Sequence, residues 1–223
     1  KDLKVKEIDP SVAMGCVGST AGTLASLPQS LAQSFPSYDI FVKENKAKLP
    51  VLGMLMLETQ QPRDVGSFNH PGSFSYQVKQ QVVKGLTLEV CHTGKLTPDL
   101  EKSFAESIAA LEAAGASVIC GDTGFMMWFQ PLVRKSTKLP VILSSLAVLP
   151  SIFCSYGADE QIAVLTANSE LFKPMATLIH DECGVDVSDR RIVVVGCEDI
   201  PGFRDISFGQ HGDTSTMEQG LVA

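Results

Sequence analysis

Long apolar runs alternate with polar turns from residue 48 onward, and this pattern predicts alternating strands and helices. The run LPVLGMLML at 49–57 is apolar throughout, which is typical of a strand buried on both faces. A weaker strand is predicted at 76–86, after a polar segment that begins at Glu58. The remaining apolar runs predict strands at 117–120, 139–145, 161–167 and 190–197.

Three helices are predicted between these strands. The clearest begins at Thr97, a good N-cap residue with proline after it, and stops at Gly115. A second helix is predicted at 126–137, where Pro131 restricts the start, and a third at 169–182. Strands that alternate with helices favour an α/β fold with parallel sheets.

The two halves of this series resemble each other, since in each an apolar strand leads into a polar loop, ETQQP or TANSE. The repeat predicts that the second half continues beyond Ala223, through a helix into a third strand. The segment before the first strand is rich in Ser, Ala, Gly and Pro, and is either an organelle-targeting remnant or a loop with a short helix. We therefore predict an N-terminal extension at 1–46, a first α/β domain at 47–147, and a second, incomplete α/β domain at 148–223.

Composition narrows the possible partners. Of the 223 residues, 44% are hydrophobic and 19% are charged, as in a globular protein, and the net charge of −7 contains no run of like charge. The chain therefore has neither the basic footprint of a nucleic-acid-binding protein nor a polybasic membrane patch, and no apolar run approaches the ~20 residues that span a bilayer. Six cysteines without a CxxC pair or zinc spacing predict reduced thiols in an intracellular compartment, the cytoplasm or a plastid.

Four polar loops follow predicted strands, and ligands of parallel α/β sheets bind beyond the carboxyl ends of strands. Hydroxyl and amide groups in these loops can bind a carboxylate, and Arg63 is a suitable cationic partner for one. The alternative is that the Ser, Thr and Asn side chains only cap the following helices, and Asp122 is equally suited to either role. The candidate substrate-binding residues are Thr59, Gln60, Arg63, Asp122, Gly124, Ser144, Ser145, Thr166 and Asn168.

Other side chains that carry chemistry have weaker claims. The histidines have no partner at a recognisable spacing and are interpreted as structural or exposed. The run from Met126 to Phe129 either walls an apolar pocket or packs in the core, and core packing is the commoner use of such a run. Cys120 alternates toward the interior of its strand and is expected to be a core residue.

Four segments in succession resemble the aspartate/glutamate racemase superfamily and, within it, the Alma-type algal dimethylsulfoniopropionate lyases. They are PVLGMLMLETQQPRDVGSFNHPGSFSY, GDTGFMMWFQ, PVILSSLAVLP and AVLTANS, and the resemblance covers residues 47–205. It implies two pseudo-symmetric, flavodoxin-like parallel-sheet domains with the active site between them. It also implies a small zwitterionic or anionic substrate, a homo-oligomer, and no metal or organic cofactor.

In the lyases of this family, removal of the proton α to the carboxylate expels dimethyl sulfide by β-elimination and leaves acrylate. The resemblance implies a catalytic cysteine on each domain, but this chain has Thr123 at the first cysteine position. Cys120 cannot be assumed to replace that thiol, Cys197 does not match the second one, and the second position is expected beyond Ala223. Thr123 therefore predicts a weakened lyase. The alternatives are a racemase or isomerase of amino acids or small carboxylates, and a non-catalytic binding paralogue.

Overall fold

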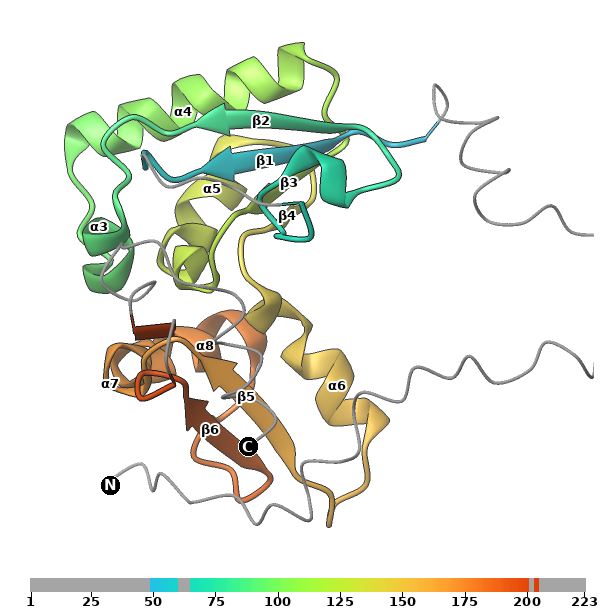
Figure 1. The fold of residues 1–223 in the computed structure, drawn as a ribbon, viewed down its shortest axis with the longest axis vertical. Coiled ribbons are helices and arrows are strands. Elements are labelled where there is room, and N and C mark those ends of the chain that lie inside the picture. Colours follow the sequence, from blue (N-terminus) through green and yellow to red (C-terminus); the bar gives the residue numbers. More distant parts are fainter. Residues whose placement is uncertain (1–48, 60–64, 201–202, 205–223) are drawn as a thin grey trace, which may run out of the picture.

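In a computed structural model of the protein, which describes residues 49–59, 65–200 and 203–204, the chain forms two separate parallel β-sheets (Figure 1). The first sheet has the strand order β2-β1-β3-β4, which is also the order of the first four strands in flavodoxin-like sheets. The predicted α/β class with parallel sheets is confirmed. The strands are β1 (Leu52–Met56), β2 (Val78–Val82), β3 (Val118–Gly121) and β4 (Val141–Ile142).

Strand β1 lies in the centre of the first sheet, as its unbroken apolar sequence predicts. Met54 and Met56 are fully buried on one face of the sheet, where they form a small cluster with Cys120. Leu55 is fully buried on the other face, in the main hydrophobic core. A strand flanked by two others and buried on both faces needs apolar side chains at every position.

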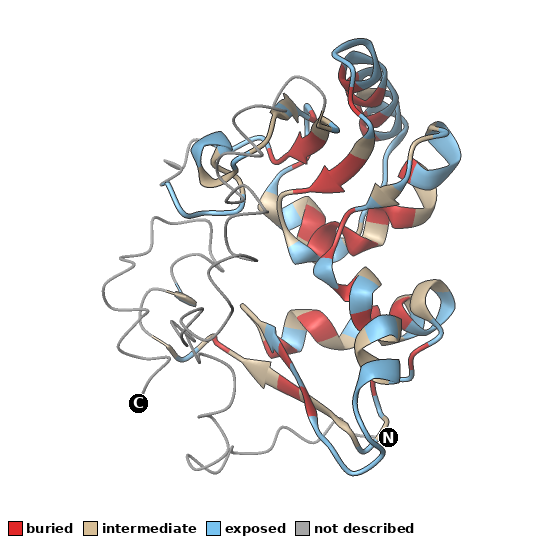
Figure 2. Ribbon diagram, turned by 90° about the vertical axis from the view of Figure 1, so that its right-hand side faces the viewer, coloured by how far each residue is buried: buried red, intermediate tan, exposed pale blue. Residues whose placement is uncertain are grey.

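The main core begins between the first sheet and helices α4 (Pro98–Ala113) and α5 (Gln130–Ser136) and continues to the second half of the described chain, where it includes Ile162, Val164 and Val194 (Figure 2). Helix α4 begins as predicted, because the Thr97 hydroxyl oxygen accepts a hydrogen bond from the Leu100 N–H. Its chain leaves the helix through Gly115, which has a φ of +84° that favours glycine. The rings of Phe104 and Phe129 pack 5.1 Å apart between the two helices.

Prolines divide two of the predicted helices. The helix predicted at 126–137 is a 3₁₀ helix, η5 (Gly124–Phe129), followed by α5, in which Pro131 lies in the first turn. The helix predicted at 169–182 consists of α7 (Ser169–Phe172), η7 (Lys173–Met175) and α8 (Ala176–Cys183), with a proline in η7. Proline has no N–H to donate and favours the first turn of a new helical segment, so each division follows from local chemistry.

Four short helical segments were not predicted, because one or two turns show little periodicity. They are η4 (Pro71–Ser73), α3 (Leu88–Thr93), η6 (Ser145–Val148) and α6 (Leu149–Ser155). The strands predicted at 76–86 and 139–145 are also shorter than expected. Strand β4 has two residues because the N–H of Leu143 donates to the side-chain oxygen of Gln130, at 2.8 Å.

The second sheet consists of β5 (Ile162–Thr166) and β6 (Ile192–Gly196), which pair in parallel. The predicted domain boundary at 147/148 falls within η6 and remains a prediction. The predicted extension at 1–46 lies outside the described residues. Among the described helices, none is long and apolar enough to cross a membrane.

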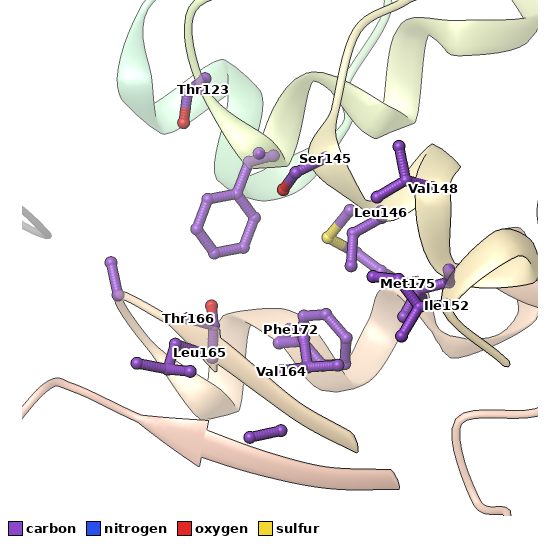
Figure 3. Close-up of a pocket in the computed structure, with 15 residues that line it drawn as sticks. Thr123, Ser145, Leu146, Val148, Ile152, Val164, Leu165, Thr166, Phe172 and Met175 are labelled. Atoms are coloured by element: carbon purple, nitrogen blue, oxygen red, sulfur yellow. The ribbon is translucent and has the colours of Figure 1, made fainter. Parts of the chain in front are cut away.

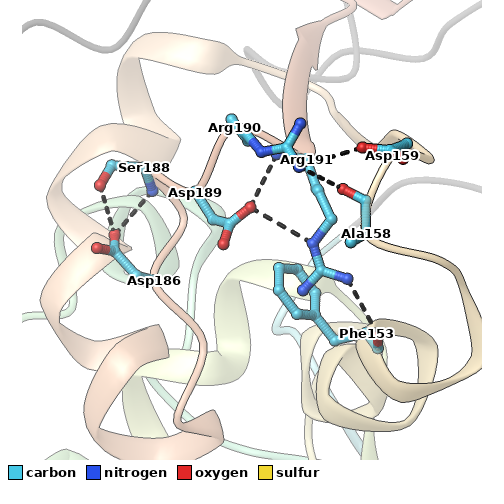
Figure 4. A network of polar contacts seen from close by, with 8 residues as sticks. All are labelled: Phe153, Ala158, Asp159, Asp186, Ser188, Asp189, Arg190 and Arg191. Carbon is cyan, nitrogen blue, oxygen red and sulfur yellow. Dashed lines mark hydrogen bonds and ion pairs between the residues drawn. The ribbon is translucent and has the colours of Figure 1, made fainter.

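Arg191 holds helix α6 against the loop that enters β6 (Figure 4). Its guanidinium lies 3.7 Å from the centroid of the Phe153 ring and donates to the Phe153 carbonyl at 3.3 Å. The same side chain forms an ion pair with Asp189, from Nε to Oδ1 at 3.5 Å. These contacts position α6, which lines the cavity described next.

Candidate active site

A cavity of about 370 Å³ lies between the two sheets, within the size range of small-molecule sites (Figure 3). The first sheet contributes the loop after β3 and the segment after β4, and the second contributes β5 and the loop that follows it. The polar side chains among the lining residues are hydroxyls. Those hydroxyls belong to Thr123, Ser145 and Thr166, which come from three of the four predicted loops.

Thr123 lies at the end of β3 with an extended backbone, φ −144° and ψ 146°. Its side chain is half-buried and makes no capping hydrogen bond with η5. The loop approaches β4 closely at Gly121, since a Cβ at that glycine would lie 2.5 Å from the Leu143 carbonyl oxygen. Gly124 is close to the same segment, since a Cβ there would lie 3.8 Å from the Ser144 hydroxyl oxygen, so the loop after β3 packs against the segment after β4.

The two serines after β4 have different environments. Ser144 is buried, and its hydroxyl oxygen accepts from the Leu146 N–H at 3.2 Å, which caps η6. Ser145 is exposed and lines the cavity. The capping alternative thus describes Ser144, whereas Ser145 lines the cavity and its role in substrate binding remains a prediction.

Thr166 and Asn168 differ in the same way. The Thr166 hydroxyl lines the cavity and donates to the Asn168 carbonyl oxygen at 3.3 Å. The Asn168 side chain accepts from the Leu171 N–H at 3.0 Å and so caps α7. Asn168 is not among the residues that line the cavity.

The other predicted residues lie apart from this cavity or outside the described ranges. Asp122 precedes Thr123 and accepts from the Leu57 N–H at 3.0 Å, which ties the ends of β3 and β1 together. Thr59 is exposed and is not among the lining residues. Gln60 and Arg63 lie outside the described residues. Substrate binding by these four side chains remains a prediction.

The thiols near the first sheet are poor bases. Burial first, and the Asp122 carboxylate second, raise the pKa of Cys120 to about 12. The same two causes raise the pKa of Cys91 further still. Cys120 also lies with Met54 and Met56, on the face of the sheet away from the main core. These findings agree with its interpretation as a core residue, so it does not supply a thiolate at the Thr123 position.

A carboxylate occupies the start of α7, beside the second sheet. Glu198 accepts hydrogen bonds from the Ser169 hydroxyl and from the Ser169 N–H, the latter at 3.1 Å. Burial acts to raise the pKa of Glu198, but these hydrogen bonds and the Lys173 ammonium outweigh burial and lower it. The Ser169 and Leu171 N–H groups at this helix start therefore already have acceptors within the chain.

The lowered pKa of Glu198 predicts a loss of stability in acid. Because the pKa is lower in the folded state, the ionised carboxylate stabilises the fold above the unfolded pKa of about 4.3, and this contribution disappears as the pH falls through the folded pKa. We expect Glu198→Gln to lower Tm at pH 7 and to reduce the fall of Tm between about pH 5 and pH 3. Thermal unfolding across this range measures both effects. Glu106→Gln is the control, since the Glu106 side chain is 68% exposed and pairs with Lys102 rather than with Lys173, and an equal change in that variant would contradict the assignment.

The apolar walls of the cavity were missed by sequence reasoning. Met126, Met127 and Phe129 are core residues with at most 1% exposure, so the core alternative is correct for them. The neighbouring Phe125 lines the cavity instead. The other wall residues come from segments whose apolar spacing gives no functional signal. They are Leu146, Val148, Leu149, Ile152, Val164, Leu165, Phe172 and Met175.

Metal ligation has no support among the described residues, which contain no group of three or more His, Cys, Asp or Glu side chains that could hold an ion. The described lining residues offer hydroxyls, peptide groups and apolar surface. Together, the two parallel sheets and the hydroxyl-lined cavity between them define an α/β protein with a site of small-molecule size.

Comparison with known proteins identifies the family to which the chain belongs. No protein-family model matches the chain. The chain is 47% identical over 173 residues to dimethylsulfoniopropionate lyase 3 of Emiliania huxleyi, covering 78% of this chain and 45% of that protein. It is 38% identical over 214 residues to the dimethylsulfoniopropionate lyase of Durusdinium sp. clade D, covering 96% of this chain and 69% of that protein. The chain belongs to the dimethylsulfoniopropionate lyase family, which confirms the resemblance seen in its sequence.

The chain spans about half the length of the Emiliania relatives that it matches, 45% of lyase 3 and 55% of lyase 7. Two solved structures are also similar. One is a mutant of arylmalonate decarboxylase, with 16% identity and a TM-score of 0.46, covering 77% of this chain and 70% of that chain. The other is an aspartate racemase homologue from Pyrococcus horikoshii, with 12% identity and a TM-score of 0.44, covering 73% and 74%.

Proposed function

We propose that this protein is a carbon–sulfur lyase that cleaves dimethylsulfoniopropionate to dimethyl sulfide and acrylate. The observation that carries the proposal is the meeting of Thr123, Ser145 and Thr166 in one cavity of a chain that belongs to the lyase family. Thr123 and Ser145 make no side-chain hydrogen bond within the described part of the chain, so both hydroxyls are able to donate to a carboxylate.

The proposed reaction is a β-elimination. A base at position 123 removes the proton from the carbon next to the carboxylate. The electron pair of that C–H bond forms the double bond of acrylate, the carbon–sulfur bond breaks, and sulfur leaves with its electron pair as neutral dimethyl sulfide. Negative charge develops on the carboxylate side during proton removal, where hydroxyl and peptide N–H donors stabilise it most effectively. A threonine hydroxyl is a poor base at neutral pH, so we infer that Thr123 slows this step.

The substrate-binding residues of the proposal are those that the cavity and its adjoining loops offer. Ser145 and Gly124 line the cavity beside Thr123, and Thr166 lines it from the second sheet. Asp122 and Ser144 support these loops through hydrogen bonds to the backbone. Thr59, Gln60, Arg63 and Asn168 are retained as candidate substrate-binding residues on sequence grounds.

The uncharged lining favours an onium substrate over an amino acid. Among the fifteen described lining residues, none carries a charged side chain. A primary ammonium group has three N–H donors, and burying them without acceptors costs free energy. A dimethylsulfonium group has no N–H or O–H donor, so its burial does not carry this cost. This difference supports lyase chemistry over amino-acid racemisation.

Thr123 supports a second candidate, a non-catalytic protein that binds the same zwitterion. Cys120 is the cysteine closest to Thr123 in the sequence, and burial together with the Asp122 carboxylate raises its pKa to about 12, which disfavours its thiolate. Incubation of the full-length protein with dimethylsulfoniopropionate, followed by headspace detection of dimethyl sulfide and calorimetric measurement of binding, distinguishes the two. Release above the rate without protein supports the lyase, binding without release supports the binder, and absence of both contradicts the two proposals.

We further propose a homo-oligomer in the cytoplasm or a plastid. Exposed apolar side chains on both sheets support association, among them Leu165 at 62%, Ile142 at 46% and Val82 at 44% exposure. Unpaired cysteines in the described part of the chain support a reducing compartment. Light scattering of the purified protein tests the first proposal, and a fluorescent fusion in an algal host tests the second.

A further inference from the structure

Phe125 is an aromatic wall of the cavity that has no role in the proposed proton transfer. It lines the cavity two residues after Thr123, and most of its ring is buried, with 7% of the residue exposed. The His92 ring packs against it in a T-shaped arrangement, with centroids 5.0 Å apart and planes at 74°. Burial lowers the pKa of His92, which keeps this neighbour uncharged near neutral pH. One side of the Phe125 ring is thus fixed by packing, and the residue faces the cavity with its remaining surface.

A sulfonium group places a specific demand on such a cavity. Its positive charge is spread over methyl groups that cannot donate conventional hydrogen bonds, so hydroxyl oxygens satisfy it poorly. In the absence of a carboxylate among the described lining residues, the face of an aromatic ring offers negative electrostatic potential to methylated cations.

The connectivity of the substrate keeps the sulfonium close to the base, in the part of the cavity that Phe125 also lines. The carbon that loses its proton is separated from sulfur by one methylene group, so both lie within a few ångströms of the base. Position 123 and Phe125 belong to one short loop that lines a single cavity, with Thr123 extended and η5 starting at the next residue. A substrate whose reacting carbon lies at position 123 therefore has its sulfonium within reach of the lining residues next to Thr123, and Phe125 is the aromatic one among them.

We propose that the Phe125 ring binds the methylated onium group of the substrate and so determines the preference for methylated onium carboxylates. This inference rests on the proposed function, because it assumes that the cavity binds dimethylsulfoniopropionate. Phe125 acts on specificity, through an interaction that a carboxylate of the same shape with an uncharged carbon in place of the onium atom does not make.

The other phenylalanine of the cavity provides a matched control. Phe172 is 2% exposed, belongs to α7 beside the second sheet, and lies near Val164 in Figure 3, away from Thr123. It packs within the hydrophobic core, where its replacement affects stability and shape. An onium site at Phe125 predicts different consequences for the two substitutions.

The test compares two ligands of one shape that differ in charge. β-Alanine betaine carries a trimethylammonium group, and its isostere 4,4-dimethylpentanoate keeps the carboxylate but has an uncharged quaternary carbon in place of the nitrogen. Calorimetry on the full-length protein gives the ratio of their dissociation constants without requiring turnover. We expect Phe125→Leu to reduce the preference for the betaine by about 3- to 30-fold, and Phe125→Tyr to retain it. Phe172→Leu is expected to leave the ratio within about 2-fold of the natural protein.

The outcomes separate this inference from the proposed function. An unchanged ratio in Phe125→Leu, an equal fall in Phe172→Leu, or the failure of both ligands to bind the natural protein would overturn the onium site. A selective fall with no release of dimethyl sulfide from dimethylsulfoniopropionate would support the onium site and contradict the lyase. Thermal unfolding of each variant verifies that the measured protein is folded.

Discussion

Thr123→Cys is expected to raise the rate of dimethyl sulfide release by about 10²–10⁴, the range that one positioned acid or base group contributes. A free thiol has a pKa of about 8.5 and supplies some thiolate near neutral pH, whereas the threonine hydroxyl stays protonated. The half-buried Thr123 side chain makes no hydrogen bond that caps η5, so the exchange leaves the fold intact. Headspace detection of dimethyl sulfide and solvent deuterium exchange into the substrate measure the effect in the full-length protein.

The neighbouring carboxylate adds a pH signature to this prediction. Besides burial, the Asp122 carboxylate raises the pKa of both Cys91 and Cys120, and it is adjacent to position 123. The rate of Thr123→Cys is therefore expected to rise with pH as its thiol ionises. Asp122→Asn in the same background retains an acceptor for the Leu57 N–H and is expected to move this rise by roughly one unit to lower pH.

Thr123→Ser is the control, because it keeps a hydroxyl at the same position, and its rate is expected to stay near that of the natural protein. Equal rates for the threonine and cysteine forms would show that position 123 is not the base. The alignment of GDTGF with the family's cysteine loop would then be wrong.

Gln130→Met is expected to lower the free energy of unfolding by about 2–5 kcal/mol, since about 1–3 kcal/mol is lost for each buried polar group left without a partner. Gln130 is 6% exposed and joins α5 to the last strand of the first sheet. Its amide nitrogen donates to the Val141 carbonyl oxygen, and its oxygen accepts from the Leu143 N–H, each at 2.8 Å. Methionine has a similar length but can make neither bond, and denaturant titration measures the loss.

This substitution is also expected to reduce any lyase activity, because the residues that follow Leu143 carry Ser145 into the cavity. Gln161→Met is the control, since Gln161 is exposed at the entry to β5 and its replacement should change stability by less than about 0.5 kcal/mol. A Gln130→Met protein as stable as that control would show that solvent replaces the two hydrogen bonds.

Secondary structure was predictable where an apolar pattern extends over a whole helix or strand and recognisable residues mark its ends. Thr97 and Gly115 bound α4 as the sequence indicates, and β1 has the unbroken apolar sequence of a central strand. Prediction failed where a contact distant in sequence decides the structure. Strand β4 is short because Gln130, on a different element, takes the Leu143 N–H, and no local pattern contains that information.

The candidate site was likewise predictable in part. The rule that ligands bind beyond the carboxyl ends of parallel strands selected the loops of Thr123, Ser145 and Thr166, and all three line one cavity. The rule does not tell a cavity hydroxyl from a capping side chain. Ser144 and Asn168 cap helical segments, and only the backbone geometry after each strand separates them from their neighbours.

The Thr123 side chain forms no cap for η5, and the fold around it is held by other contacts. Threonine and cysteine are therefore close to interchangeable for folding at this position, although they differ greatly as bases. In a duplicated gene, drift between the two residues would not be opposed by misfolding, and chemistry could be lost and regained in single steps.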